Sequence, residues 1–254
     1  MKKVCILNIF IFILAFTGIA SSEEKLPIYN LSVSVDTKSN LLKGAASITF
    51  FEETEKAIST GDLQIISVRF NGQTFVPEMK DGVFKLIGKG TLEINYEGSF
   101  SKSIHADKEE GEIENLENTG VTSKNIVSDE GIFLTSLWYP SFQGRAYWHL
   151  KALLPQGLTG ISEADEIEIT NTTLGSEYSF YFPYPLQGVH LVAGPYTQHF
   201  ESHQGITIYT YFLPEDFSLA KTYIEFSKKY LSLYGELLGH YPYKRFSVKR
   251  KIMA

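Results

Sequence analysis

Two histidines four residues apart, in the segment HFESH, are the pair in this sequence whose spacing comes nearest to that of a metal site. His199 and His203 enclose Glu201, and histidines at this spacing share a zinc ion when a helix carries them, because one turn brings both imidazoles to the same side. The flanking residues, however, alternate as in a strand, where positions four apart are separated by about 13 Å. We therefore predict a polar strand edge at HFESH and assign no metal ligands or catalytic residues in this chain.

Other motifs that carry chemistry are missing from the sequence. It contains no Gly-x-Ser-x-Gly segment and no glycine-rich phosphate loop. The only cysteine, Cys5, lies in the N-terminal apolar segment, so a processed chain would have no thiol for a disulfide, a metal or a nucleophile. The formal charge of -6 gives no electrostatic basis for binding nucleic acid. We expect no nucleic-acid partner.

The first residues have the pattern of a secretory signal peptide. Two lysines precede an apolar run from Val4 to about Ala20, and small residues then lead to an acidic start. The run is shorter than the ~20 residues that a spanning helix needs, which argues against the alternative of a retained membrane anchor. We predict a signal peptide at residues 1–22, cleaved after Ala20 or Ser22, and a periplasmic or secreted protein without a membrane span.

The elements that would have to position any site are mostly strands. Apolar and polar residues alternate in YNLSVSV, from Tyr29, and in LKGAASITF, from Leu42. Turn residues lie between the two segments, which predicts a hairpin. Further strands are predicted at 63–70, 73–79, 82–87, 91–100, 131–140, 146–155, 165–174, 176–185, 188–202 and 205–214. The dipeptides Asn71-Gly72 and Asp81-Gly82 are tight-turn signals. We predict an all-β, mainly antiparallel domain over residues 23–214.

One long segment and the aromatic content each leave an alternative open. Residues 101–127 are polar and rich in Glu, Asn and Ser, which predicts a solvated acidic loop or, as the alternative, an acidic binding segment. The 15 Tyr and 18 Phe residues fall mostly at alternate strand positions or on a helix. We therefore expect core packing rather than a stacking platform for carbohydrate or nucleic acid.

The pattern changes after Pro214. Apolar residues recur at steps of three and four up to Leu238, which predicts an amphipathic helix over 217–238 that ends at Gly239. They span more than one face, whereas a terminal helix can bury only one stripe against a β-domain, so a second covering layer is expected. A strand is predicted at 246–248, before the basic ending KRKIMA. We assign residues 215–254 to the opening of a truncated second, helical domain.

The order of several segments resembles the gluzincin zinc aminopeptidases of the alanyl aminopeptidase type, peptidase family M1, and in particular their N-terminal β-domain. This resemblance implies an antiparallel β-sandwich or saddle-like architecture. YNLSVSVDTKSNLLKGAASITF is similar to the family's opening hairpin, TLEINYEGSF to the closing strand of its first sheet, and GVHLVAGPYTQHFE to the stretch that enters the catalytic domain. LWYPSFQGRAYWHLKALLP takes the place of the Phe-Pro-Cys-x-Asp-Glu-Pro segment. YGELLGHYPYKRF looks like the family's helix-Gly-x-Pro-Tyr-Pro-x-x-Lys turn.

The resemblance implies that the catalytic domain is absent. In the complete family the chain continues to a Gly-x-Met-Glu-Asn loop and to His-Glu-x-x-His with a downstream Glu, which hold zinc and supply the general base for peptide hydrolysis. This sequence contains neither motif. Zinc and a peptide substrate are thus expected only in a full-length parent, whose catalytic domain would be the natural packing partner of this chain.

The resemblance also implies one substrate-binding residue. In the family an acidic or amide residue shortly before the Phe-Pro segment receives the free amino group of the peptide, for which a carboxylate is suited. Glu130, beside Asp129, lies within a residue or two of that place, because LWYPSFQGR departs from the Phe-Pro-Cys-x-Asp-Glu-Pro pattern that would fix the alignment. The alternative is that Glu130 is a solvated residue at the start of a strand.

Three functions follow from these observations. The first is an exported, truncated N-terminal domain of a zinc aminopeptidase-like protein without peptidase activity of its own. The second is a free-standing exported β-sandwich that binds a protein or glycan surface. The third is an independent hydrolase, which would need a site that the sequence does not reveal. The apolar faces of the predicted helix favour the first, because they call for a further covering layer.

Overall fold

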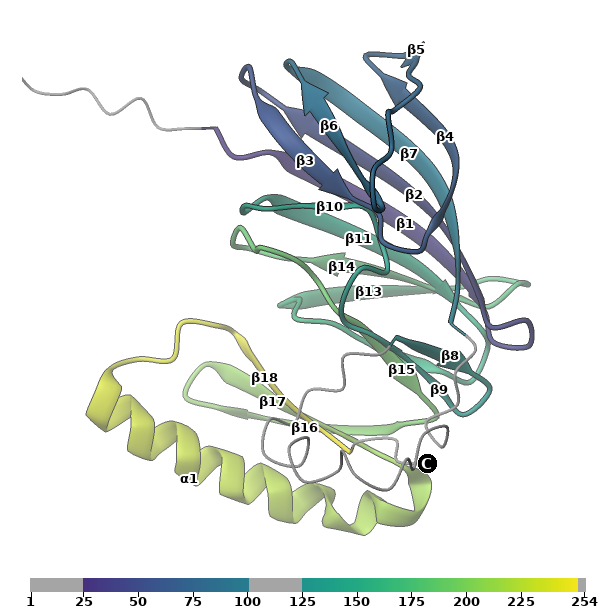
Figure 1. The fold of residues 1–254 in the computed structure, drawn as a ribbon. Coiled ribbons are helices and arrows are strands. Elements are labelled where there is room, and N and C mark those ends of the chain that lie inside the picture. The colour runs from purple at the N-terminus through teal and green to yellow at the C-terminus, as the bar shows by residue number, and fades with distance from the viewer. Residues whose placement is uncertain (1–24, 101–124, 251–254) are drawn as a thin grey trace, which may run out of the picture.

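The computed structural model describes residues 25–100 and 125–250, which form mostly strands and one long helix (Figure 1). The N-terminal half contains β1 (Ile28–Asp36), β2 (Leu41–Phe50), β3 (Glu55–Ser59), β4 (Gln64–Phe70), β5 (Gln73–Thr74), β6 (Val83–Ile87), β7 (Gly90–Ser99), β8 (Ile126–Ser128) and β9 (Gly131–Leu134). Then follow β10 (Ser141–Phe142), β11 (Tyr147–Leu154), β12 (Thr159–Ile161), β13 (Glu166–Asn171), β14 (Ser176–Tyr181), β15 (Leu191–Gly194), β16 (Thr197–His203), β17 (Ile206–Phe212), the 3₁₀-helix η2 (Pro214–Leu219), α1 (Ala220–Leu238) and β18 (Arg245–Lys249).

The strands form four sheets. The largest has eight strands in the order β13-β14-β11-β1-β2-β7-β4-β5, and the others have the orders β10-β3-β6, β12-β15-β9-β8 and β16-β17-β18. Most neighbours are antiparallel, while β1 pairs with β11 and β17 pairs with β18 in parallel. The predicted all-β, mainly antiparallel fold is confirmed.

The predicted first hairpin is confirmed, and its apolar face is buried. β1 and β2 pair antiparallel from Ile28 opposite Thr49 to Asp36 opposite Leu41. The β1 side chains Tyr29, Leu31, Val33 and Val35 are all buried, as their alternation predicts.

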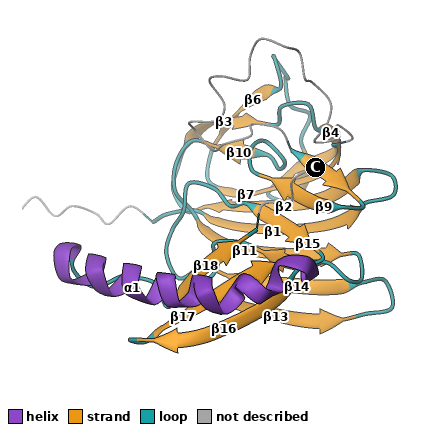
Figure 2. Ribbon diagram, turned by 90° about the horizontal axis from the view of Figure 1, so that it is seen from below, coloured by secondary structure: helices purple, strands orange, loops and turns teal. Residues whose placement is uncertain are grey.

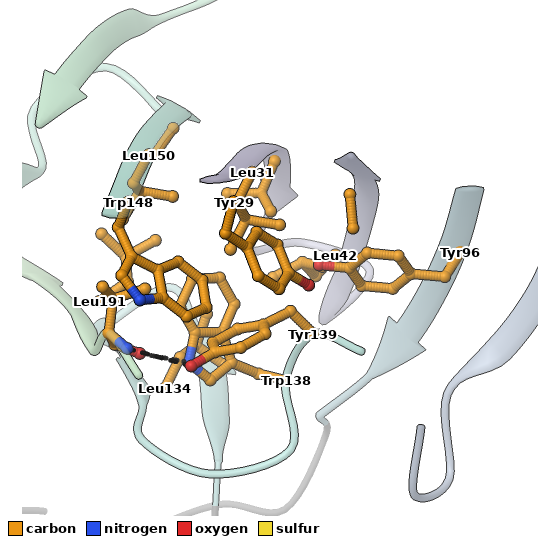
Figure 3. Packing of buried hydrophobic residues seen from close by; sticks show 14 of the residues in the cluster. Tyr29, Leu31, Leu42, Tyr96, Leu134, Trp138, Tyr139, Trp148, Leu150 and Leu191 are labelled. Carbon is orange, nitrogen blue, oxygen red and sulfur yellow. Dashed lines mark hydrogen bonds between the residues drawn. The ribbon is translucent and has the colours of Figure 1, made fainter. Parts of the chain in front are cut away.

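An aromatic cluster lies at the centre of the main core (Figure 3). The rings of Tyr29 and Trp148 stack with centroids 4.1 Å apart, on the parallel pair β1 and β11. Tyr139 meets both rings edge-on, and its hydroxyl accepts a hydrogen bond from the Val189 backbone N–H. Burial of large rings supplies much of the hydrophobic stabilisation of such a core. Through Tyr139 the cluster packs the segment between β9 and β11 against β1 and β11 of the large sheet.

Some strands are shorter than predicted, and some were not predicted. In 73–79 only Gln73 and Thr74 form a strand, since Pro77 has no N–H to donate to a sheet. In 131–140 the strand ends at Leu134, before the positive φ of 52° at Leu137. The strands β8, β10 and β12 have two or three residues, too few to show an alternation, while β3 buries only Ile58 and shows no apolar alternation.

The helix is confirmed, with a 3₁₀ turn where its first residues were expected. α1 begins at Ala220, and the preceding turn Pro214–Leu219 is η2. The helix ends before Gly239, whose φ of 98° suits a residue without a side chain. α1 packs on β16 and β17 and forms a layer beside this small sheet (Figure 2). Within the described residues, no helix combines the length and apolarity needed to cross a membrane.

Several predicted segments lie outside the described residues. They are the signal peptide at 1–22, most of the acidic loop at 101–127 and the last residues of KRKIMA. At the end of the predicted loop, Ile126 and Val127 are buried in β8, so regular structure resumes there before residue 128.

Candidate functional site

The HFESH segment forms part of β16, as predicted, and its polar side chains contact α1. His203 Nε2 lies 2.9 Å from Ser232 Oγ, and Lys228 Nζ lies 2.5 Å from Glu201 Oε2. Over residues 25–100 and 125–250, no group of three or more His, Cys, Asp and Glu is placed to hold a metal ion. These contacts connect β16 to α1.

Glu130 lies in the turn between β8 and β9, where it and Asp129 are exposed. The turn presents the carboxylate to solvent. The contact with a peptide amino group that the resemblance implies stays a prediction.

A groove of about 650 Å³ lies between the sheet β12-β15-β9-β8 and the segment 241–249, which contains β18. Its apolar lining includes Phe133, Ile161, Val192, Tyr241 and Tyr243. Beneath it, Tyr196 and Tyr211 join Ile161 and Val192 in a buried cluster that connects the two sheets. This groove is the candidate functional site.

One wall of the groove carries cations on a single face of β18. Arg245, Ser247 and Lys249 alternate along the strand, and all three line the groove. The Arg245 guanidinium lies 3.8 Å from the ring centroid of Tyr209 and donates a hydrogen bond to the Tyr211 hydroxyl. Burial, partly opposed by the charge of Arg245, raises the pKa of Tyr211 to about 12, so this hydroxyl stays protonated at neutral pH. The guanidinium is therefore held in a defined orientation.

The opposite wall contains an ion pair between Glu163 and His190. The carboxylate contacts His190 Nδ1 and also accepts the His190 backbone N–H at 3.1 Å. The hydrogen bond that His190 donates to the Glu163 carboxylate raises the pKa of His190, although burial and the charge of Lys249 oppose this. Burial works to raise the pKa of Glu163, but the hydrogen bond and charge of His190 outweigh it and lower this pKa. The pair joins the segment after β12 to the segment before β15.

The groove does not contain a nucleophile activated by a base in the part of the chain that the structure describes. Ser162 Oγ donates to the backbone carbonyl of His190 at 2.7 Å and lies 3.2 Å from Glu163 Oε2, but makes no hydrogen bond with the imidazole. In a Ser-His-Asp triad the serine hydroxyl is hydrogen-bonded to the imidazole. Ser162 is therefore not placed as the nucleophile of such a triad.

Sequence reasoning missed this groove. Its polar residues come from segments far apart in the chain, and no spacing links Glu163 or His190 to Arg245. The one signal available was the alternation of Arg245, Ser247 and Lys249, which places two cations on one face of a strand.

Comparisons with known proteins show a structural likeness without a sequence match. No protein-family model matches the chain, and no curated protein matches it in sequence. An M1 zinc metallopeptidase from Deinococcus radiodurans is similar in structure, with 12% identity and a TM-score of 0.66, over 88% of this chain and 56% of that chain.

Two further structures give the same result. A mutant two-domain M1 zinc metallopeptidase bound to L-arginine has 12% identity and a TM-score of 0.64. A mutant M1 zinc metallopeptidase from Deinococcus radiodurans bound to a Tyr-Ser-Ala substrate has 14% identity and a TM-score of 0.62. Each match again covers 88% of this chain and 56% of the other. The fold is thus like that of the M1 zinc metallopeptidases, and this chain spans little more than half of their length.

Proposed function

We propose that this chain is the N-terminal β-domain, with the first elements of the second domain, of an M1 metallopeptidase-like protein, and that it has no peptidase activity of its own. The observation that carries the proposal is the structural match over 88% of the chain at a TM-score of 0.66. The sequence contains no His-Glu-x-x-His, which would supply two zinc ligands and the general base. Zinc and the hydrolysis of N-terminal residues from peptides would belong to a full-length parent.

The exposed side of α1 supports a missing packing partner. α1 buries a stripe that contains Ile224 and Leu231, whereas Phe226 is 62% exposed and Leu237 is 67% exposed. A contiguous apolar surface in contact with water usually marks an interface. In this proposal the remainder of the catalytic domain covers it.

Glu130 has a role only within the complete protein. Its exposed turn leaves the carboxylate accessible. In the full-length parent it would receive the free amino group of a bound peptide through a charge-assisted hydrogen bond.

Export is part of the same proposal. Removal of residues 1–22 would leave a periplasmic or secreted chain whose charge changes from -6 to -8 through the loss of Lys2 and Lys3. N-terminal sequencing of the protein recovered from the exported fraction tests this. A chain that keeps Met1 and stays with the membrane would contradict it.

One measurement tests the peptidase lineage, and a second tests the proposed lack of activity. The coding sequence beyond Ala254, read in all frames, is expected to contain His-Glu-x-x-His, and a downstream region without it would overturn the lineage. The purified chain is expected to bind no stoichiometric zinc and to release no amino acid from peptide amides. Zinc-dependent release by the purified chain would overturn the proposed lack of activity.

A second candidate function is a free-standing binding or adhesion module. The observation that favours it is the groove, which is lined by residues of this chain and needs no further domain to form. A monomeric, protease-resistant chain would support this function, whereas association through the exposed side of α1 would favour the first proposal.

A further inference from the structure

The Arg245 guanidinium has no carboxylate partner among the described residues, although it lies in a groove wall. The ion pairs of the described residues include Lys228 with Glu201 and Arg250 with Asp216, but none with Arg245. Of the five N–H groups of a guanidinium, Nε donates to Ser247 Oγ and Nη2 donates to the Tyr211 hydroxyl, which leaves three. These donors match the two oxygens of a carboxylate.

The orientation of this guanidinium is already set before any ligand binds. Tyr209 lies against its face, and Tyr211 and Ser247 fix its edge. A side chain ordered in advance loses less conformational entropy on binding. Arg245 is thus built as an anion contact rather than as a solvated surface cation.

The rest of the groove suits an apolar body. Tyr241 and Tyr243 stand beside β18, and Ile161 and Val192 form the facing wall. The volume of about 650 Å³ falls within the roughly 300–1,000 Å³ of small-molecule sites. A flat ring could lie between these walls with an acidic group at Arg245.

The acidic residues of the groove limit the charge of the ligand. Glu163 is paired with His190, while Asp165 is a second carboxylate in the lining. Lys249 is a second cation of the lining and its charge offsets that of Asp165, so the positive charge left over for a ligand is the single charge of Arg245. The charge balance therefore favours a single negative charge.

We propose that this groove binds an organic monocarboxylate with a flat apolar body, whose carboxylate is held by the Arg245 guanidinium. The proposal rests on the groove alone and requires neither zinc nor a catalytic domain. It holds whether the chain is part of a peptidase or a separate binding module.

Calorimetric titration of the purified chain with naphthalene-acetate tests the proposal, with the neutral naphthalene-acetamide as a probe of the same shape. We expect the acid to bind at least about tenfold more tightly than the amide, because a charge-assisted pair is lost. Inorganic phosphate is expected to bind more weakly than the acid. Equal binding of acid and amide, no binding of the acid, or tighter binding of phosphate would each overturn the proposal.

Variants locate the site. Arg245→Met is expected to weaken binding of the acid at least about tenfold and to leave the amide unchanged, and Arg245→Lys to weaken it less. Lys244→Met is the matched control, since Lys244 is exposed and is not part of the groove lining. Its Nζ lies 3.9 Å from Glu166 Oε1. Far-ultraviolet circular dichroism confirms that each variant is folded. Folded Arg245→Met with undiminished preference for the acid would contradict the assignment.

Discussion

The ring of Tyr96 occupies the space in front of Gly44, so that a Cβ built at Gly44 would lie 2.1 Å from Tyr96 Cζ. The two residues are direct partners across β2 and β7, and Tyr96 is 1% exposed. The backbone of Gly44 has no positive φ that would call for glycine. Glycine is required here because of the neighbouring ring.

Replacing this glycine should destabilise the fold. Gly44→Ala is expected to lower the free energy of unfolding by about 1–3 kcal/mol, because the buried ring must move into occupied space. Gly235→Ala is the control, since nothing lies within 4 Å of a Cβ at this helical position. It should raise the free energy of unfolding by about 0.5–1 kcal/mol. Urea unfolding measures both, and a loss of stability in Gly235→Ala or none in Gly44→Ala would refute the explanation.

Removal of the hydroxyl group should change the free energy of unfolding differently at two core tyrosines. Tyr29 donates to the Pro140 carbonyl, whereas the buried Tyr96 hydroxyl has no hydrogen-bond partner among the described residues. Tyr29→Phe is expected to cost about 1–2 kcal/mol, because it leaves a buried carbonyl unpaired. Tyr96→Phe is expected to be neutral or stabilising by up to about 1 kcal/mol. Denaturant unfolding measures both variants. Equal losses of unfolding free energy would show that the Tyr96 hydroxyl makes a hydrogen bond in the folded chain.

Local patterns predicted the parts of the fold that depend on neighbouring residues. The alternation from Tyr29 gave a correct hairpin, and both Asn71 and Asp81 have the positive φ that their turn dipeptides predict. The parallel pairing of β1 with β11 was not predicted, because Tyr29 and Trp148 meet only through the tertiary fold. Resemblance of whole segments, rather than periodicity, supplied the architecture.

The candidate groove could not be predicted for the same reason. Glu163 precedes β13, His190 precedes β15 and Arg245 opens β18, so only the packing of two sheets brings these residues to one groove. HFESH shows the opposite case. Its strand periodicity correctly outweighed the histidine spacing, because backbone geometry at that position is local.

The ion pair of Glu163 and His190 should give a pH-dependent contribution to stability. The raised pKa of His190 stabilises the fold below the ordinary value of 6.5, and this contribution is lost as pH rises through the raised value. The lowered pKa of Glu163 stabilises it above the ordinary value of 4.5, and this is lost as pH falls through the lowered value. The pair therefore contributes most between about pH 4.5 and 6.5.

Comparison of wild type with Glu163→Gln measures this contribution. The difference in unfolding free energy should stay below about 1 kcal/mol, because the two side chains are 42% and 51% exposed and solvent weakens their attraction. It should peak in the stated pH range and fall on both sides. Glu78→Gln, at another exposed carboxylate, should show no such maximum, and a flat profile for Glu163→Gln would rule out the pair as its source.

The exposed side of α1 should cause self-association of the purified chain. Leu233 is 55% exposed and Leu237 is 67% exposed, four residues apart on the same side, while Leu231 is 4% exposed in the cluster beneath the helix. Leu233→Gln with Leu237→Gln is expected to reduce association in sedimentation velocity and to leave the free energy of unfolding within about 0.5 kcal/mol. Leu231→Gln should instead cost more than about 2 kcal/mol, because it buries an amide without a partner. If the double variant associated as strongly as wild type, this side of α1 would not be the surface through which the chain associates. If the double variant unfolded, Leu233 and Leu237 would contribute to the packing of the folded chain.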